Sequence, residues 1–203
     1  MRKINKQLPI GSFKRFLKDG PTLWREIHLS ENQHVYKESR DFILINEQNE
    51  MCGYTELPLS ENDKDIHIDH YKKRDLFPRE TFDWNNLIVA LKSDEFGADY
   101  KDNRYHIKKE EYSQILNPAT DIAQDYFEYL ATGDIRPKPW LTPPEKLKAE
   151  KTIEVFNLNH ASLVNRRKGL VRMINAYKGL RKEVVASYIA PLGFKSLQEQ
   201  ELL

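Results

Sequence analysis

The segment DIHIDHY, residues 65–71, contains the side chains of this chain that are best suited to chemistry. His67, Asp69 and His70 place two imidazoles and a carboxylate within four residues. Apolar and polar residues alternate through the segment, which is typical of a β-strand whose successive side chains point to opposite faces. We therefore expect His67 and Asp69 on one face of a strand and His70 at its end, beside the turn that follows.

An aspartate next to a histidine at the end of a strand suits metal-dependent hydrolysis of a phosphodiester. Carboxylate oxygens are preferred ligands of Mg²⁺ and Mn²⁺, so Asp69 is a candidate metal ligand. The neutral imidazole of His70 is a candidate general base that takes a proton from water while the metal polarises the phosphate. Asn86, in the segment DWNNL, is expected to hydrogen-bond the loop that carries His70 and to fix its orientation.

The HxDH pattern by itself also has a structural interpretation. Histidine and aspartate often pair in proteins simply because buried polar groups need partners. His67 lies two residues before Asp69 along the strand. We therefore expect it near the metal, where it supports the ligand Asp69 rather than catalysing.

Basic residues are expected to bind the phosphates of a nucleic acid, since such contacts fix its position on a protein. Lys72, Lys73 and Arg74 follow directly after the strand, and Arg166 and Arg167 lie in the segment NRRK. For Arg166 and Arg167, a solvated helix face is the alternative interpretation.

Composition limits the class of protein. The 203 residues are 31% charged with a net charge of +1, so any basic surface must be local. Cys52 is the only cysteine, which excludes an internal disulfide and favours a reducing cytoplasm. The first residues lack the apolar core of a signal peptide, and no apolar run is long enough to span a membrane. We expect a cytoplasmic protein.

The elements around the candidate site are expected to form one α+β domain that is mostly α-helical. Helices are expected over residues 1–48, a strand-containing catalytic core over 49–112, and a hairpin followed by helices over 113–203. Within the core, MCGYTELPL and DIHIDHY are predicted to be antiparallel strands joined by the loop SENDK. WNNLIVALK is predicted to be a helix with Asp83 as its N-cap.

The final third also has clear local signals. The segment YFEYLATGDIRPKPW predicts a hairpin that turns at residues 132–134. The segment TPPE predicts a helix that begins at Thr142, with Glu145 at the capping-box position, and continues to about Phe156. His160 is expected at a helix start. The helical stripe that follows carries the cationic residues Arg166, Arg167, Lys168, Arg172 and Lys178.

These motifs carry a family resemblance. HIDH, a turn with a proline, and NNL together resemble the ββα-metal fold of HNH nucleases. The order of MRKINK, FKRFL, HIDHYKKRDLFPRETFDWNNL, ILNP, DYFEYLATGDI and NLNHASLVNRRK is similar to the retron- and Septu-associated HNH family called PtuB, over residues 1 to roughly 170. The resemblance implies a nuclease effector of antiphage defence. It implies a PtuA-like ATPase of the ABC or SMC type as partner and, in some systems, a retron reverse transcriptase with its multicopy DNA.

The resemblance also implies roles for individual positions. Asp69 matches the metal-binding acid, His70 the general base and Asn86 the asparagine at the helix start, with His67 at the start of the strand motif. In the segment EFGADYKDNR, Asp99 takes the position of a metal-binding histidine, although Asp102 and Asn103 are close enough to compete.

Two departures from the family pattern affect these expectations. Phe96 stands where relatives commonly have a cysteine, and Thr55 replaces the partner of Cys52 in a CxxC pair. We therefore expect Cys52 in the core and no structural zinc. The expected function is that of a metal-dependent HNH endonuclease acting on DNA or on an RNA such as tRNA. The alternative, favoured by Phe96, Ala98 and Thr55, is a catalytically degenerate HNH adaptor that binds the partner ATPase and nucleic acid.

Overall fold

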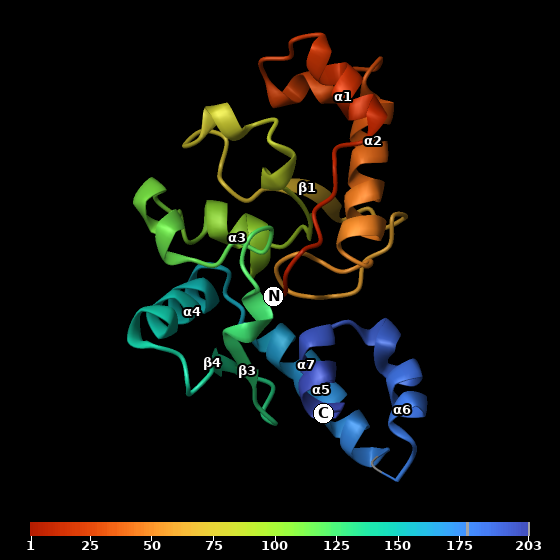
Figure 1. Ribbon diagram of the computed structural model, residues 1–203, viewed down its shortest axis with the longest axis vertical. Coiled ribbons are helices and arrows are strands. Elements are labelled where there is room, and N and C mark those ends of the chain that lie inside the picture. Colours follow the sequence, from red (N-terminus) through yellow and green to blue (C-terminus); the bar gives the residue numbers. More distant parts are fainter. Residues whose placement is uncertain (178, 203) are drawn as a thin grey trace.

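The computed structural model describes residues 1–177 and 179–202, and Lys178 lies outside this part. The chain folds as an α+β protein in which helices predominate, as expected. Figure 1 shows α1 and α2 at one end of the molecule, α5, α6 and α7 at the other, and β1 and α3 between them. The helices and strands in chain order are α1 (Gly11–Lys18), α2 (Gln33–Phe42), β1 (Ile66–His70), β2 (Leu87–Leu91), α3 (Gly97–Asn103), β3 (Phe127–Tyr129), β4 (Ile135–Pro137), α4 (Pro143–Val155), α5 (Ala161–Ala176), α6 (Lys182–Ile189) and α7 (Lys195–Leu202).

The N-terminal helices cover the loop that joins β1 to β2. Phe13 and Phe16 are the buried aromatic residues of α1. The ring of Phe13 packs edge-on against Trp84 at 5.0 Å between centroids, and Phe16 lies 5.9 Å from Phe82. The predicted helical stretch is interrupted after α1, where Gly20 has a φ of 70° that suits glycine. These helices therefore hold the β1–β2 loop from outside.

The strand β1 forms where the alternating segment predicted it, but its partner was predicted wrongly. β1 pairs with β2 in an antiparallel register that places Asp69 opposite Ile88 and His70 opposite Leu87. The residues of β2 were predicted to be a helix. They form a strand because four of the five are fully buried, so a continuous apolar run takes the place of a helical stripe. Asp83 caps only a short 3-10 turn before the strand.

The backbone N–H and carbonyl of Val89, on the outer edge of β2, find hydrogen-bond partners without a third strand. The side chain of Gln48 donates to the carbonyl of Val89 and accepts from its N–H, each at 2.8 Å. The N–H of Gly53 donates to the same carbonyl at 3.0 Å. The segment 51–59 was predicted to pair with DIHIDHY as an antiparallel strand and instead forms a loop with one bridge, between Met51 and Pro58. A Cβ at Gly53 would lie 2.3 Å from Ile88, so only glycine fits there.

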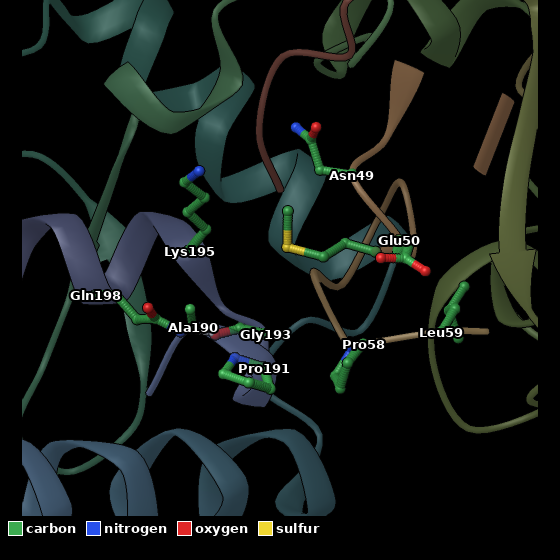
Figure 2. Close-up of a pocket in the computed structure, with 10 residues that line it drawn as sticks. Asn49, Glu50, Pro58, Leu59, Ala190, Pro191, Gly193, Lys195 and Gln198 are labelled. Carbon is green, nitrogen blue, oxygen red and sulfur yellow. Dashed lines mark hydrogen bonds between the residues drawn. The ribbon is translucent and has the colours of Figure 1, made fainter. Parts of the chain in front are cut away.

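A second feature of this loop is its contact with the C-terminal helices. Where the loop meets the turn before α7, a cavity of about 310 Å³ opens, and Figure 2 shows residues of the two segments around it. Gly193 has a φ of 72°, and a Cβ there would lie 2.4 Å from the carbonyl of Glu56. No residue of the predicted site lines this cavity. The loop therefore joins the sheet to the helices rather than extending the sheet.

The C-terminal third follows its local signals. The predicted hairpin forms as β3 and β4, with Phe127 opposite Pro137. The predicted helix forms as α4, and the backbone N–H of Thr142 donates to Glu145 at 2.8 Å as in a capping box. His160 caps α5 by accepting from the N–H of Ser162. Cys52 is buried in the core, as expected. Within residues 1–177 and 179–202, no helix is both long enough and apolar enough to cross a membrane.

Candidate functional site

The residues singled out in the sequence meet in a cleft between the end of β1 and α3. The cleft has a volume of about 270 Å³. Its two sides are linked, because α3 packs against β2 and β2 pairs with β1. The lining residues are Trp24, His67, Ile68, Asp69, His70, Lys73, Arg74, Asp75, Asp99, Asp102 and Asn103.

His70 is held in one orientation by its surroundings. Its Nε2 atom lies 2.9 Å from the carbonyl oxygen of Thr81, which can only accept, so Nε2 carries the proton of the neutral ring. The ring also packs edge-on against Trp24, with 4.5 Å between centroids. Burial lowers the pKa of His70 to about 4, and the cations Arg74 and Lys101 act in the same direction. No described residue hydrogen-bonds Nδ1, so this atom remains as an acceptor for a molecule in the cleft.

Asp69 is held through one of its two oxygens. The hydroxyl of Tyr54 donates to Oδ2 at 2.5 Å, and the ammonium group of Lys101 lies 3.7 Å from the same oxygen. Burial alone would raise the pKa of Asp69, but Lys101, His67 and Tyr54 together hold this pKa below its usual value. The carboxylate is therefore charged at neutral pH, and none of the described residues hydrogen-bonds Oδ1.

His67 and Asp99 face each other across the cleft. Nε2 of His67 lies 3.9 Å from Oδ1 of Asp99, while Oδ2 of Asp99 accepts from the N–H of Ser93 at 3.0 Å. Nδ1 of His67 is buried and has no hydrogen-bond partner. Asp102 is engaged differently, because its Oδ1 accepts from Lys101 at 2.9 Å. Asn103 lines the rim.

These donors fit one type of metal ion. Mg²⁺ is commonly held through one or two carboxylates and completes its shell with water and phosphate oxygens. Asp69 and Asp99 offer two carboxylates, and each has one oxygen that accepts no hydrogen bond from a described residue. Across residues 1–177 and 179–202, no three His, Cys, Asp or Glu side chains are placed to hold a metal by themselves. Two carboxylates that share an ion with water and phosphate oxygens are donors of the type that suits Mg²⁺ or Mn²⁺.

Asn86 lies outside the cleft and closes the β1–β2 loop. Its Oδ1 accepts from the N–H of Lys72 at 2.7 Å, and its Nδ2 donates to the carbonyls of Lys72 and Glu80 at 3.1 and 3.0 Å. The expected hydrogen bonds to the loop after His70 are therefore present, although Asn86 ends a 3-10 turn just before β2 and does not begin a helix. Asn86 positions this loop and does not touch the reacting groups.

The predicted phosphate-binding residues separate into two groups. Lys73 and Arg74 line the cleft. Lys72 does not, since its ammonium group pairs with Glu80 at 2.9 Å. Arg166 is exposed on α5 and does not line the cleft either.

The prediction for Arg167 is wrong. Arg167 is buried, with 1% of its surface exposed, and donates to the carbonyls of Gly133 at 2.5 Å and Leu158 at 2.8 Å. Its guanidinium group fixes the β3–β4 turn to α5 and cannot reach a nucleic acid. The β3–β4 turn lies so close to α5 that a Cβ at Gly133 would be 2.2 Å from the carbonyl of Val164.

Three residues of the site were missed in the sequence. Tyr54 and Lys101 hold Asp69, and Trp24 packs on His70. Lys101 lies in α3 among charged residues that look solvated. Asp102 lies one helical turn beyond Asp99, but Lys101 lies only two residues beyond it, so no helical spacing indicated the role of Lys101.

Comparisons with known proteins bear on the family resemblance. No protein-family model matches the chain. The chain is 28% identical over 209 residues to an Escherichia coli protein described as "Retron Ec83 putative HNH endonuclease", and this alignment covers 86% of this chain and 81% of that protein. It is 24% identical over 149 residues to "Septu protein PtuB" of Bacillus thuringiensis, over 72% of this chain and 47% of that protein. The resemblance to retron and Septu proteins is confirmed.

The two relatives differ in how much of them this chain spans. It spans most of the retron relative but about half the length of the Septu relative. What their names state, an HNH endonuclease in one case and a Septu protein in the other, describes those proteins. These names do not by themselves establish the activity, substrate or partners of this chain.

Proposed function

We propose that this chain is a metal-dependent endonuclease of the HNH type. The observation that carries the proposal is the geometry of His70, whose Nε2 is bound to the carbonyl of Thr81 while Nδ1 remains an acceptor in the cleft beside Asp69. The chain order β1, β2, α3 matches that of a ββα-metal unit, with His70 at the end of the first strand and Asp99 on the helix. The description of the Escherichia coli relative supports the same reaction class.

The residues of the cleft would divide the work of phosphodiester hydrolysis. Nδ1 of His70 takes a proton from the attacking water, since its low pKa keeps the ring neutral at physiological pH. Asp69 and Asp99, supported by His67, would hold Mg²⁺ or Mn²⁺ through their carboxylates. When bound, such an ion polarises the phosphate and stabilises charge on the departing oxygen. Lys73 and Arg74 at the rim orient the phosphate chain.

The proposed setting is antiphage defence. It is supported by the names of the two relatives, one from a Septu and one from a retron system. The proposed partners are a PtuA-like ATPase of the ABC or SMC type and, in a retron system, a reverse transcriptase with its multicopy single-stranded DNA. The proposed substrate is DNA or a structured RNA such as tRNA, because a metal ion and a histidine that act on a phosphate can hydrolyse either nucleic acid.

The test is a cleavage assay with the chain alone and with its partner ATPase, on plasmid DNA and on total tRNA, in Mg²⁺, Mn²⁺ or EDTA. The proposal requires that cleavage depend on the metal and be lost in both His70→Ala and Asp69→Asn. Cleavage that persists unchanged in both variants would refute the assignment of the site. Restriction of cleavage to one nucleic acid would identify the substrate.

A second candidate is a nucleic-acid-binding adaptor that does not cut. It is favoured by the absence, within the described part of the chain, of a complete protein metal cage, and by the Lys101 ammonium group beside Asp69. An adaptor would bind the ATPase and nucleic acid equally well as wild type and as His70→Ala, and neither form would cut with any metal.

A further inference from the structure

The ammonium group of Lys101 lies in a cage of oxygen atoms at the base of the cleft. Its Nζ is 3.3 Å from the carbonyl of His70 and 3.0 Å from the carbonyl of Tyr71. It is also 2.9 Å from Oδ1 of Asp102 and 3.7 Å from Oδ2 of Asp69. The side chain has no exposed surface. Lys101 is therefore an internal cation that touches neither solvent nor a molecule in the cleft.

The oxygen atoms of this cage are of the types that commonly coordinate hard metal cations. Carboxylates and backbone carbonyls are typical ligands of Ca²⁺ and Mg²⁺. Asp69 and Asp102 would repel each other without a cation between them, and an unpaired buried charge is costly. Lys6, a nearly buried lysine elsewhere in the chain, differs in this respect, because it contacts one carboxylate, Glu47, and one carbonyl, Leu87.

We propose that Lys101 is a built-in cation that occupies a second cation position between Asp69 and Asp102. As a result, Lys101 already neutralises Asp102 through its Oδ1 atom, and the Oδ1 atoms of Asp69 and Asp99 are the carboxylate oxygens proposed for one exchangeable divalent ion. The inference deepens the proposed nuclease function and rests on it for the exchangeable ion. The cage itself is defined by the contacts of Lys101 alone.

Lys101 also positions the residues that face the cleft. It binds the carbonyl of His70 directly and so joins the end of β1 to α3. Together with the Tyr54 hydroxyl it occupies Oδ2 of Asp69, which turns the other oxygen towards the cleft. Lys101 is thus a positioning residue, and its removal changes both the number of ions bound and the order of the site.

The direct test is to count bound Mn²⁺ by electron paramagnetic resonance and to measure thermal unfolding with and without Mn²⁺. Wild type should bind one ion. Lys101→Ala should bind one ion more, and Mn²⁺ should restore much of the roughly 10 °C that this variant loses in Tm. Lys6→Ala is the matched control, and it should lose stability without gaining an ion.

The possible outcomes separate the two proposals. An equal number of ions in wild type and Lys101→Ala, with no recovery of Tm by Mn²⁺, would overturn the cage. If wild type bound no ion but Lys101→Ala bound one, the cage would stand and the metal-dependent nuclease would fail.

A second measurement covers the case in which Lys101→Ala does not fold. With Lys101 in place, Asp102→Asn should change the Mn²⁺ dissociation constant by less than about threefold, a free-energy change under about 0.7 kcal/mol. Asp99→Asn should weaken Mn²⁺ binding by about tenfold or more. Equal weakening by both substitutions would show that Asp102 is a ligand and would overturn the inference.

Discussion

Nε2 of His70 lies 2.9 Å from the carbonyl oxygen of Thr81, across the loop that joins the two strands of the first sheet. Because a carbonyl can only accept, this contact selects the ring tautomer and decides which nitrogen can take a proton. The loop therefore contributes to the site through its backbone. The residues that hold the loop in place also fix the orientation of His70.

Substituting His70 should abolish cleavage without unfolding the protein. His70→Ala removes the proposed base, and a general base contributes about 100-fold to 10,000-fold to the rate. The measurement is the single-turnover cleavage rate at saturating Mg²⁺, with circular dichroism to confirm the fold. His160→Ala is the control, because His160 caps α5 and does not line the cleft. A rate within twofold of wild type, to within about 0.4 kcal/mol, would remove His70 from the mechanism.

Acidification should destabilise the protein through His70. Its pKa is about 4 when folded and 6.5 as an ordinary side chain, so between these values the unfolded chain binds more protons. The free energy of unfolding therefore falls as the pH is lowered through this window, by about 3 kcal/mol between pH 7 and pH 4. Urea denaturation of wild type and His70→Gln over this pH range measures the pH dependence of the free energy of unfolding. Equal pH dependence in the two proteins would contradict the lowered pKa.

Asn86 should control the rate through the loop. Asn86→Ala leaves the N–H and carbonyl of Lys72 and the carbonyl of Glu80 without these partners, and each buried unpaired group costs about 1–3 kcal/mol. We expect a lower Tm and a fall of about tenfold in cleavage rate, with Mn²⁺ affinity less affected. Asn85→Ala is the matched control, since Asn85 is exposed and its side chain makes no such bonds. Similar effects at both positions would exclude a specific role for Asn86.

Arg167 and Arg74 should behave in opposite ways. Arg167→Met should lower the free energy of unfolding by about 3 kcal/mol, because two buried carbonyls lose a charged donor. Its affinity for nucleic acid should keep the wild-type salt dependence. Arg74→Ala should leave stability nearly unchanged and reduce the slope of log affinity against log salt by about one. Binding titrations at several salt concentrations measure this slope for both variants. A reduced slope in Arg167→Met would contradict the structural role of Arg167.

The sequence predicted best where a signal is local. The alternation in DIHIDHY predicted β1, and Thr142 with Glu145 predicted the start of α4, because each pattern depends on neighbouring residues alone. The strand β2 was mistaken for a helix since its apolar residues fit either period when both faces are buried. Gln48 completes the edge of that strand from a distant segment, which no local pattern could show.

The same limit applies to the candidate site. His67, Asp69 and His70 could be selected because they are adjacent in one strand. Lys101 and Tyr54 reach Asp69 from different parts of the chain, and a buried lysine looks like any surface lysine until the fold places carboxylates around it. Arg167 shows the converse, since its position in a basic run concealed a buried structural role.

The most direct test of the proposed nuclease is cleavage by wild type and by Asp69→Asn of the same plasmid DNA and total tRNA, with the partner ATPase present, in Mg²⁺ and in EDTA. The proposed mechanism predicts that wild type cuts one of these substrates in Mg²⁺ only and that Asp69→Asn cuts neither. Metal-independent cutting by wild type, or equal cutting by Asp69→Asn, would contradict it.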